Sequence, residues 1–157
     1  MKTELAFATS DQHVAIVREL FREYAAGLSI DLCFQNFEEE LATLPGSYAP
    51  PHGRLLVAKV GQQTAGCIAL RPMEANVAEV KRLYVRPDFR RRGLGKALVA
   101  RVLDEARRIG YRSARLDTLR EMQNAIALYS AFGFEEVAPY RQGEPEGICY
   151  FELKLNG

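Results

Sequence analysis

The sequence lacks the features that would point to a disulfide framework, a metal site or a membrane protein. Its three cysteines, Cys33, Cys67 and Cys149, are an odd number, lie far apart and form no CxxC or CxxH pair. No segment approaches the roughly 18 apolar residues that a membrane span needs, and the first residues, MKTELAFATSDQH, contain no long apolar signal segment. We therefore expect a cytoplasmic protein that binds no metal and no membrane.

The sequence also lacks an excess of charge of either sign. Lysine and arginine (21 residues) nearly balance aspartate and glutamate (20 residues), which leaves a net charge of +1. No global field would draw the chain to nucleic acid or to an anionic membrane, so any anion site must be local. A basic face formed by residues 90–92 with Arg101, Arg107 and Arg108 is the weakest functional hypothesis, because acidic residues are interspersed and no nucleic-acid-binding motif is present.

Hydrophobic residues make up 48% of the 157 positions, which is enough for one continuous core. We predict a single domain over residues 1–157. Alternation of apolar residues predicts strands at residues 4–9, 54–60, 64–73, 78–85, 113–118 and 148–155, with a further segment, FEEVAPY, after Gly133. Helical spacing predicts helices after Ser10, around residues 37–44, at 94–109 and at 124–132.

A strand, a long helix and a strand in that order suit a right-handed parallel crossover, whereas the three strands between residues 54 and 85 read as an antiparallel meander. The expected fold is therefore α/β (α+β), with a mixed, mostly antiparallel sheet of six or seven strands and about four helices.

The most informative segment is RLYVRPDFRRRGLGKALV, residues 82–99, where a strand leads through a glycine-punctuated turn into a helix. Backbone N–H groups at a helix start are unpaired and carry the positive end of the helix dipole, so they suit a phosphate or pyrophosphate. Gly93 and Gly95 allow the backbone to approach such a ligand closely. Four basic side chains add positive charge: Arg90, Arg91, Arg92 and Lys96.

Two other phosphate-binding motifs do not fit this loop. Leucine stands where the third Rossmann glycine belongs, and Lys96 is not followed by the serine or threonine of a P-loop. A solvated helix cap without a ligand is the remaining alternative.

The pattern Arg90-x-x-Gly93-x-Gly95, after the apolar strand VKRLYV and RPDF, resembles the acyl-CoA signature of the GNAT superfamily of N-acetyltransferases. The segment NAIALYSAFGFEEV, with Tyr129 and the Gly133-Phe134 pair, resembles the helix and strand that follow in that superfamily. The resemblance covers roughly the C-terminal half of the chain. It implies a GNAT-like domain that moves an acetyl group from acetyl-CoA directly to an amine of a small molecule or a protein.

A non-catalytic acyl-CoA-binding sensor on the same fold is the alternative function. The presence of Tyr129 makes this alternative less favoured, because binding alone needs no phenol near the thioester. Acetyl-CoA and an amine acceptor are the expected partners, and the choice between monomer and homodimer is left open.

The resemblance implies that the pyrophosphate of CoA lies on the amides of residues 91–96 and that the pantetheine arm runs beside residues 83–85. A free N–H near Leu83 or Tyr84 would polarise the thioester carbonyl. The implied cofactor-binding residues are Leu83, Tyr84, Val85, Arg90, Arg91, Arg92, Gly93, Leu94, Gly95, Lys96, Asn124 and Tyr129. Asn124, at the start of its helix, is alternatively a helix cap.

Transfer needs an acid to protonate the departing thiolate and a base to take the amine's proton. Tyr129 is the candidate acid, since a phenol with a reference pKa of about 10 is protonated at neutral pH; a core aromatic is the alternative. Glu79, on the strand that leads to Leu83, is the candidate base. The alternatives are a solvated, outward-facing Glu79, a role for Glu74 instead, or no dedicated base.

The acceptor site is expected between residues 24 and 48, as the resemblance implies. Asp31 and residues 38–40 would attract a cationic amine, and Phe34, Phe37 and Tyr48 would form walls. An alternative that is at least as good is that Phe37 and Leu41, at helical spacing, are core contacts and that residues 38–40 form a solvated helix face. Cys67 and Cys149 are expected to be core residues, so the predicted mechanism is sequential and forms no acyl-cysteine.

Overall fold

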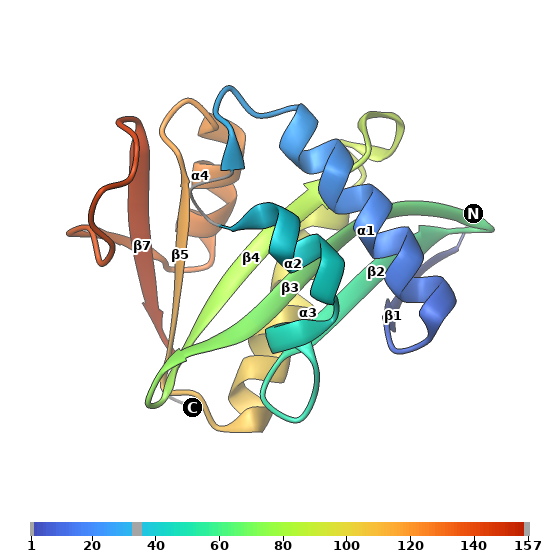
Figure 1. The fold of residues 1–157 in the computed structure, drawn as a ribbon, viewed down its shortest axis with the longest axis horizontal. Coiled ribbons are helices and arrows are strands. Elements are labelled where there is room, and N and C mark those ends of the chain that lie inside the picture. Colours follow the sequence, from blue (N-terminus) through green and yellow to red (C-terminus); the bar gives the residue numbers. More distant parts are fainter. Residues whose placement is uncertain (1, 33–35, 156–157) are drawn as a thin grey trace.

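The computed structural model describes residues 2–32 and 36–155, in which one seven-stranded sheet carries helices on both faces (Figure 1). Cys33 and Phe34 lie outside the described residues. The strands are β1 (Thr3–Phe7), β2 (Arg54–Val60), β3 (Gln63–Glu74), β4 (Val77–Val85), β5 (Ser113–Leu119), β6 (Glu135–Val137) and β7 (Ile148–Lys154). The α-helices are α1 (Asp11–Ala26), α2 (Phe37–Thr43), α3 (Leu94–Ile109) and α4 (Gln123–Ala131).

The strand order is β1-β2-β3-β4-β5-β7-β6. Neighbouring strands are antiparallel except β4 and β5, which are parallel and are joined through α3. The predicted mixed, mostly antiparallel sheet is therefore confirmed, and so is the parallel crossover over α3.

The helix ends follow from local sequence. Ser10 caps α1, because its hydroxyl oxygen accepts a hydrogen bond of 3.1 Å from the His13 N–H. Gly93 before α3 and Gly110 after it both have positive φ, 77° and 110°, a conformation that glycine adopts without strain.

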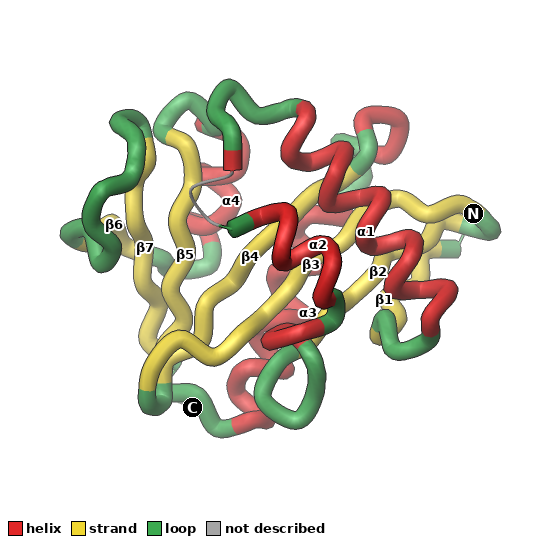
Figure 2. Tube along the Cα trace, viewed as in Figure 1, coloured by secondary structure: helices red, strands yellow, loops and turns green. Residues whose placement is uncertain are grey.

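The sheet separates two apolar cores, and the helices on its two sides are seen clearly in Figure 2. On one face α3 and α4 pack against the sheet through residues such as Leu98, Val102 and Tyr129. On the other face α1 and α2 lie over β2, β3 and β4, and bury Phe21 and Leu41 there. No helix in the described part of the chain is long and apolar enough to cross a membrane.

The loop between β6 and β7 reaches the part of this second face that lies beyond α1 and α2. It places Tyr140 and Arg141 against Glu79 of β4 and Asp117 of β5. This region is therefore lined by polar and charged groups rather than by a helix.

Candidate active site

The parallel strands β4 and β5 pair only at their beginnings. Val77, Ala78 and Glu79 are partners of residues 113–115, and no further pair forms. The strands then separate toward the end of the sheet where α4 lies (Figure 1), so the backbone of residues 83–85 pairs with no residue of β5. We call this region the β4–β5 opening, and it contains the predicted contacts Leu83, Tyr84 and Val85.

A bulge in β4 shapes this opening. The register with β3 shifts between the partners of Cys67 and Ala69, and Arg82 has a φ of 61°, in the left-handed region. Gly66 of β3 lies so close that a Cβ there would be 2.4 Å from the Tyr84 carbonyl oxygen. A glycine is therefore required where the two backbones approach beside the bulge.

Residues 90–96, which we call the amide loop, comprise the turn after Phe89 and the first three residues of α3. Its Arg90 N–H donates to Pro87 O, and the next paired amide is that of Ala97, which donates to Gly93 O at 3.0 Å. The N–H groups of residues 91–96 donate to no described residue. Consecutive free amides at the positive end of a helix fit the pyrophosphate of CoA, as the sequence predicts.

The basic side chains of the amide loop differ in their roles. The Arg90 Nε donates to the Val85 carbonyl at 2.8 Å and so ties the loop to the end of β4. Arg92 lies over the Phe89 ring at 5.5 Å. Arg91, Arg92 and Lys96 are exposed. Leu94 is only 3% exposed and packs in a small core, so it offers its amide rather than its side chain.

Tyr129 lies on α4 and is 7% exposed. Its ring packs edge-on against Phe134, with 5.8 Å between ring centroids. Burial, followed by the charges of Tyr24 and Asp117, raises the pKa of the phenol, which keeps it protonated at neutral pH. Asn124 is exposed and does not cap α4, because the helix begins at Gln123 after Met122; the helix-cap alternative is therefore wrong.

Glu79 is fully buried, so the alternative of a solvated, outward-facing carboxylate is wrong. Its oxygens contact Arg71 Nη2 at 2.8 Å and Arg141 Nη2 at 2.6 Å, and the Tyr140 hydroxyl donates to it at 3.3 Å. Burial raises the pKa of Glu79, but the positive charges of Lys81, Arg71 and Arg141 outweigh burial and the net shift is downward. Such a carboxylate is a weak proton acceptor.

The structure adds a charged residue that sequence reasoning missed. Asp117 of β5 contacts Arg141 Nη1 at 2.8 Å and Lys81 Nζ at 3.8 Å. It lines a small hollow at the β4–β5 opening together with Tyr24 and Arg82. No local signal marks this residue, because its partners come from another strand and from a loop 24 residues away.

The expected acceptor residues differ in their burial and in their contacts. Phe37 and Leu41 are 8% and 2% exposed and belong to the core, as the alternative interpretation held. Tyr48, at 1% exposed, also packs in this core. Glu40 forms a two-pronged ion pair with the buried Arg82, at 2.9 and 3.0 Å. Glu38, Glu39 and Asp31 are exposed.

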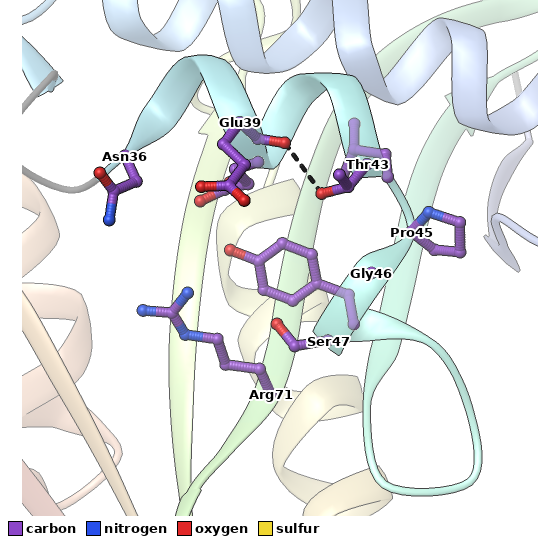
Figure 3. Close-up of a pocket in the computed structure, with 10 residues that line it drawn as sticks. Asn36, Glu39, Thr43, Pro45, Gly46, Ser47 and Arg71 are labelled. Atoms are coloured by element: carbon purple, nitrogen blue, oxygen red, sulfur yellow. Dashed lines mark hydrogen bonds between the residues drawn. The ribbon is translucent and has the colours of Figure 1, made fainter.

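Figure 3 shows Glu39, Thr43 and Arg71 around a hollow of about 230 Å³ between α2 and β3. Tyr48 also lines this hollow, whereas Phe37 does not, so one of the predicted aromatic walls is found here beside mostly polar neighbours.

The cysteines behave as core residues. Cys67 and Cys149 are buried, and their thiols donate to the carbonyls of Arg82 and Thr118, each at 3.4 Å. Burial raises the pKa of both thiols, which disfavours the reactive thiolate.

Comparison with known proteins agrees with this geometry. The acetyltransferase (GNAT) family model matches residues 15–134. An uncharacterized N-acetyltransferase from Schizosaccharomyces pombe is 40% identical over 139 residues, which is 87% of this chain and 85% of the relative. A GNAT-family acetyltransferase from Staphylococcus aureus superposes with a TM-score of 0.80 at 18% identity, covering 99% of this chain and 100% of the other. An acetyltransferase from Salmonella typhimurium, solved with its cofactor acetyl-CoA, gives 0.72 at 20% identity over 98% and 94% of the two chains.

The family match includes the β4–β5 opening, the amide loop and α4, and the chain belongs to the acetyltransferase (GNAT) family. It is an acyltransferase that takes its acetyl group from acetyl-CoA. The resemblance seen at Arg90, Gly93 and Gly95 is thereby confirmed.

Proposed function

We propose that the chain, as one N-acetyltransferase domain, transfers the acetyl group directly from acetyl-CoA to an amine while both are bound. The observation that carries this proposal is the run of free amides at residues 91–96 beside residues 83–85 of β4, which pair with no residue of β5. The first feature suits a pyrophosphate, and the second suits the peptide-like pantetheine arm. A cytoplasmic location and the choice between monomer and homodimer stay predictions.

In the proposed reaction the amine nitrogen forms a bond to the acetyl carbon, and the carbon–sulfur bond breaks. A backbone N–H near Leu83 polarises the carbonyl, and the Tyr129 hydroxyl gives its proton to the departing sulfur. Glu79 stays the candidate proton acceptor for the amine, but its two arginine partners make it a poor one. Loss of that proton to water fits the geometry better.

A sensor that binds acetyl-CoA without turnover is the alternative function. It is less favoured, because Tyr129 is buried on α4 and burial raises the pKa of its phenol, which therefore keeps a proton to donate. Binding alone requires no such donor.

A thiol-release assay with acetyl-CoA and a panel of amines tests the proposal. We expect amine-dependent release, and a Gly93→Val variant should bind acetyl-CoA more weakly, because φ at this position is 77° and valine avoids that conformation. Thermal stabilisation by CoA and none by duplex DNA are also expected. Stabilisation by acetyl-CoA without thiol release for any amine would favour the sensor. The absence of both stabilisation and thiol release would refute both functions.

A further inference from the structure

A cavity of about 450 Å³ lies on the sheet face beyond α1 and α2, beside the β4–β5 opening. We call it the arginine cavity. Its lining residues are Ser47, Arg71, Pro72, Met73, Glu74, Glu79, Arg115, Tyr140 and Arg141. They come from β3, β4, β5 and two loops, so several parts of the chain cooperate to form it. Its size suits a small molecule.

The cavity offers its occupant guanidinium groups, each of which also pairs with a carboxylate: Arg71 with Glu79, Arg115 with Glu74 and Glu152, and Arg141 with Glu79 and Asp117. The side chains of Arg71, Arg115 and Arg141 are each about a quarter exposed, at 26%, 25% and 27%. Glu79, which two of these arginines contact, is only 1% exposed. The carboxylate therefore lies beneath the guanidinium groups and holds them in place, while the guanidinium groups face the cavity.

Each guanidinium also keeps donors to spare. The described residues accept no hydrogen bond from Nη1 of Arg71, Nη2 of Arg115 or Nε of Arg141. The Tyr140 ring lies 5.5 and 5.1 Å from the Arg115 and Arg141 guanidinium carbons and fixes their positions. Planar guanidinium groups with free N–H donors bind carboxylate and phosphate oxygens well.

Arg141 connects this cavity with the site of transfer. One of its nitrogens contacts Glu79 beneath the cavity, and another contacts Asp117. Asp117 also lines the hollow at the β4–β5 opening, so the cavity and the opening lie next to each other. A molecule held by its acidic group in the cavity can therefore extend its other end toward the opening.

We propose that the acceptor is a small amine that also carries an anionic oxygen group, a carboxylate or a phosphate, which the arginine cavity binds while the amine reaches the β4–β5 opening. This inference rests on the proposed acetyl transfer and adds the substrate class. Arg71, Arg115 and Arg141 are then the residues that select the substrate.

The test compares amines that differ only in the anionic group. The pairs are β-alanine with β-alaninamide and O-phosphoethanolamine with ethanolamine, and the measurement is kcat/KM from thiol release. We expect at least one anionic member to exceed its partner by about tenfold or more, the range of charge-assisted hydrogen bonds. The pair that shows the preference distinguishes carboxylate from phosphate.

Variants connect the preference to the cavity. Arg115→Gln should remove most of the preference by raising KM for the anionic amine, and Arg115→Lys should restore part of it. Arg107→Gln is the matched control, because Arg107 lies on α3 at the opposite face of the sheet and is 43% exposed. Thermal stabilisation by CoA verifies that each variant is folded. If Arg115→Gln does not fold, Arg71→Gln is measured in its place.

The outcomes separate the two proposals. Equal kcat/KM within both pairs, or a preference that survives both Arg115→Gln and Arg71→Gln, would overturn the inference and leave acetyl transfer standing. No turnover of any amine would overturn the proposed function, and with it the substrate class. A preference that disappears in the cavity variants and persists in Arg107→Gln supports both.

Discussion

At the scale of single residues, Tyr129 has the two properties that a proton donor to a thiolate needs. Its helix holds it in a fixed place against Phe134, and burial raises its pKa so that the hydroxyl keeps its proton. The family resemblance suggests Tyr129 as the acid, and the structure gives the packing and burial of its side chain.

We predict that Tyr129→Phe lowers kcat by about 100-fold or more, the usual loss for a general acid. Affinity for acetyl-CoA should change only a few-fold, because the ring and its packing remain. Steady-state kinetics and acetyl-CoA titration check this. Tyr111→Phe is the control, since the Tyr111 hydroxyl donates to the His52 carbonyl away from the site. A kcat for Tyr129→Phe equal to that of the control would exclude Tyr129 as the acid.

The buried Lys81 predicts a pH effect on stability. Burial lowers the pKa of its ammonium to about 8, against the raising effect of Asp117 and Glu79, from an ordinary value of 10.5. Between these pH values the unfolded chain binds the proton and the folded chain does not. Stability therefore rises with pH in this window.

Lys81→Met removes this titration. Between pH 8 and 9.5 we expect the wild type to gain about 1 kcal/mol per pH unit relative to the variant. Urea unfolding of both proteins over that range measures the difference. A difference that stays constant with pH would show that the lysine titrates at its ordinary pKa.

At the scale of elements, the bulged strand β4 depends on its neighbour β3. A methyl group at Gly66 would lie 2.4 Å from the Tyr84 carbonyl oxygen, a contact that real Cβ atoms do not make. We predict that Gly66→Ala lowers the free energy of unfolding by about 2 kcal/mol. It should also weaken acetyl-CoA binding, because Tyr84 borders the β4–β5 opening.

Gly27→Ala is the matched control for this change. A Cβ at Gly27 would be 3.7 Å from its nearest neighbours, and φ there is −86°, which alanine accepts. Denaturant unfolding measures the stability of both variants, and acetyl-CoA titration measures their affinity for acetyl-CoA. Equal stability of the two variants would mean that β3 and β4 can separate at the bulge at no cost.

Elements with local signals were predictable from the sequence, and contacts between distant elements were not. The bounds of α3, residues 94–109, follow from its apolar spacing and from Gly110, and the amide loop follows from two glycines. The burial of Glu79 could not be predicted, because alternation in β4 tells only which face a side chain occupies. The loop that brings Tyr140 and Arg141 over that face lies some sixty residues away along the chain.

At the scale of the whole molecule, the two faces of the sheet carry different sites. The amide loop and α4 belong to the side of α3, whereas the arginine cavity lies on the side of α1 and α2. The β4–β5 opening connects the two sides. In the two proposals, the acetyl donor and the acceptor therefore approach each other from opposite faces.

The central claim is that acetyl-CoA binds on the free amides of residues 91–96 and beside β4. Titration of the ¹⁵N-labelled protein with acetyl-CoA, followed through backbone amide resonances, tests it directly. We predict that the largest saturable shifts fall on residues 91–96 and 83–85, while amides of β1 and β2 stay nearly unchanged. Saturable binding that leaves the amides of residues 91–96 unshifted, or no binding at millimolar acetyl-CoA, would contradict the account.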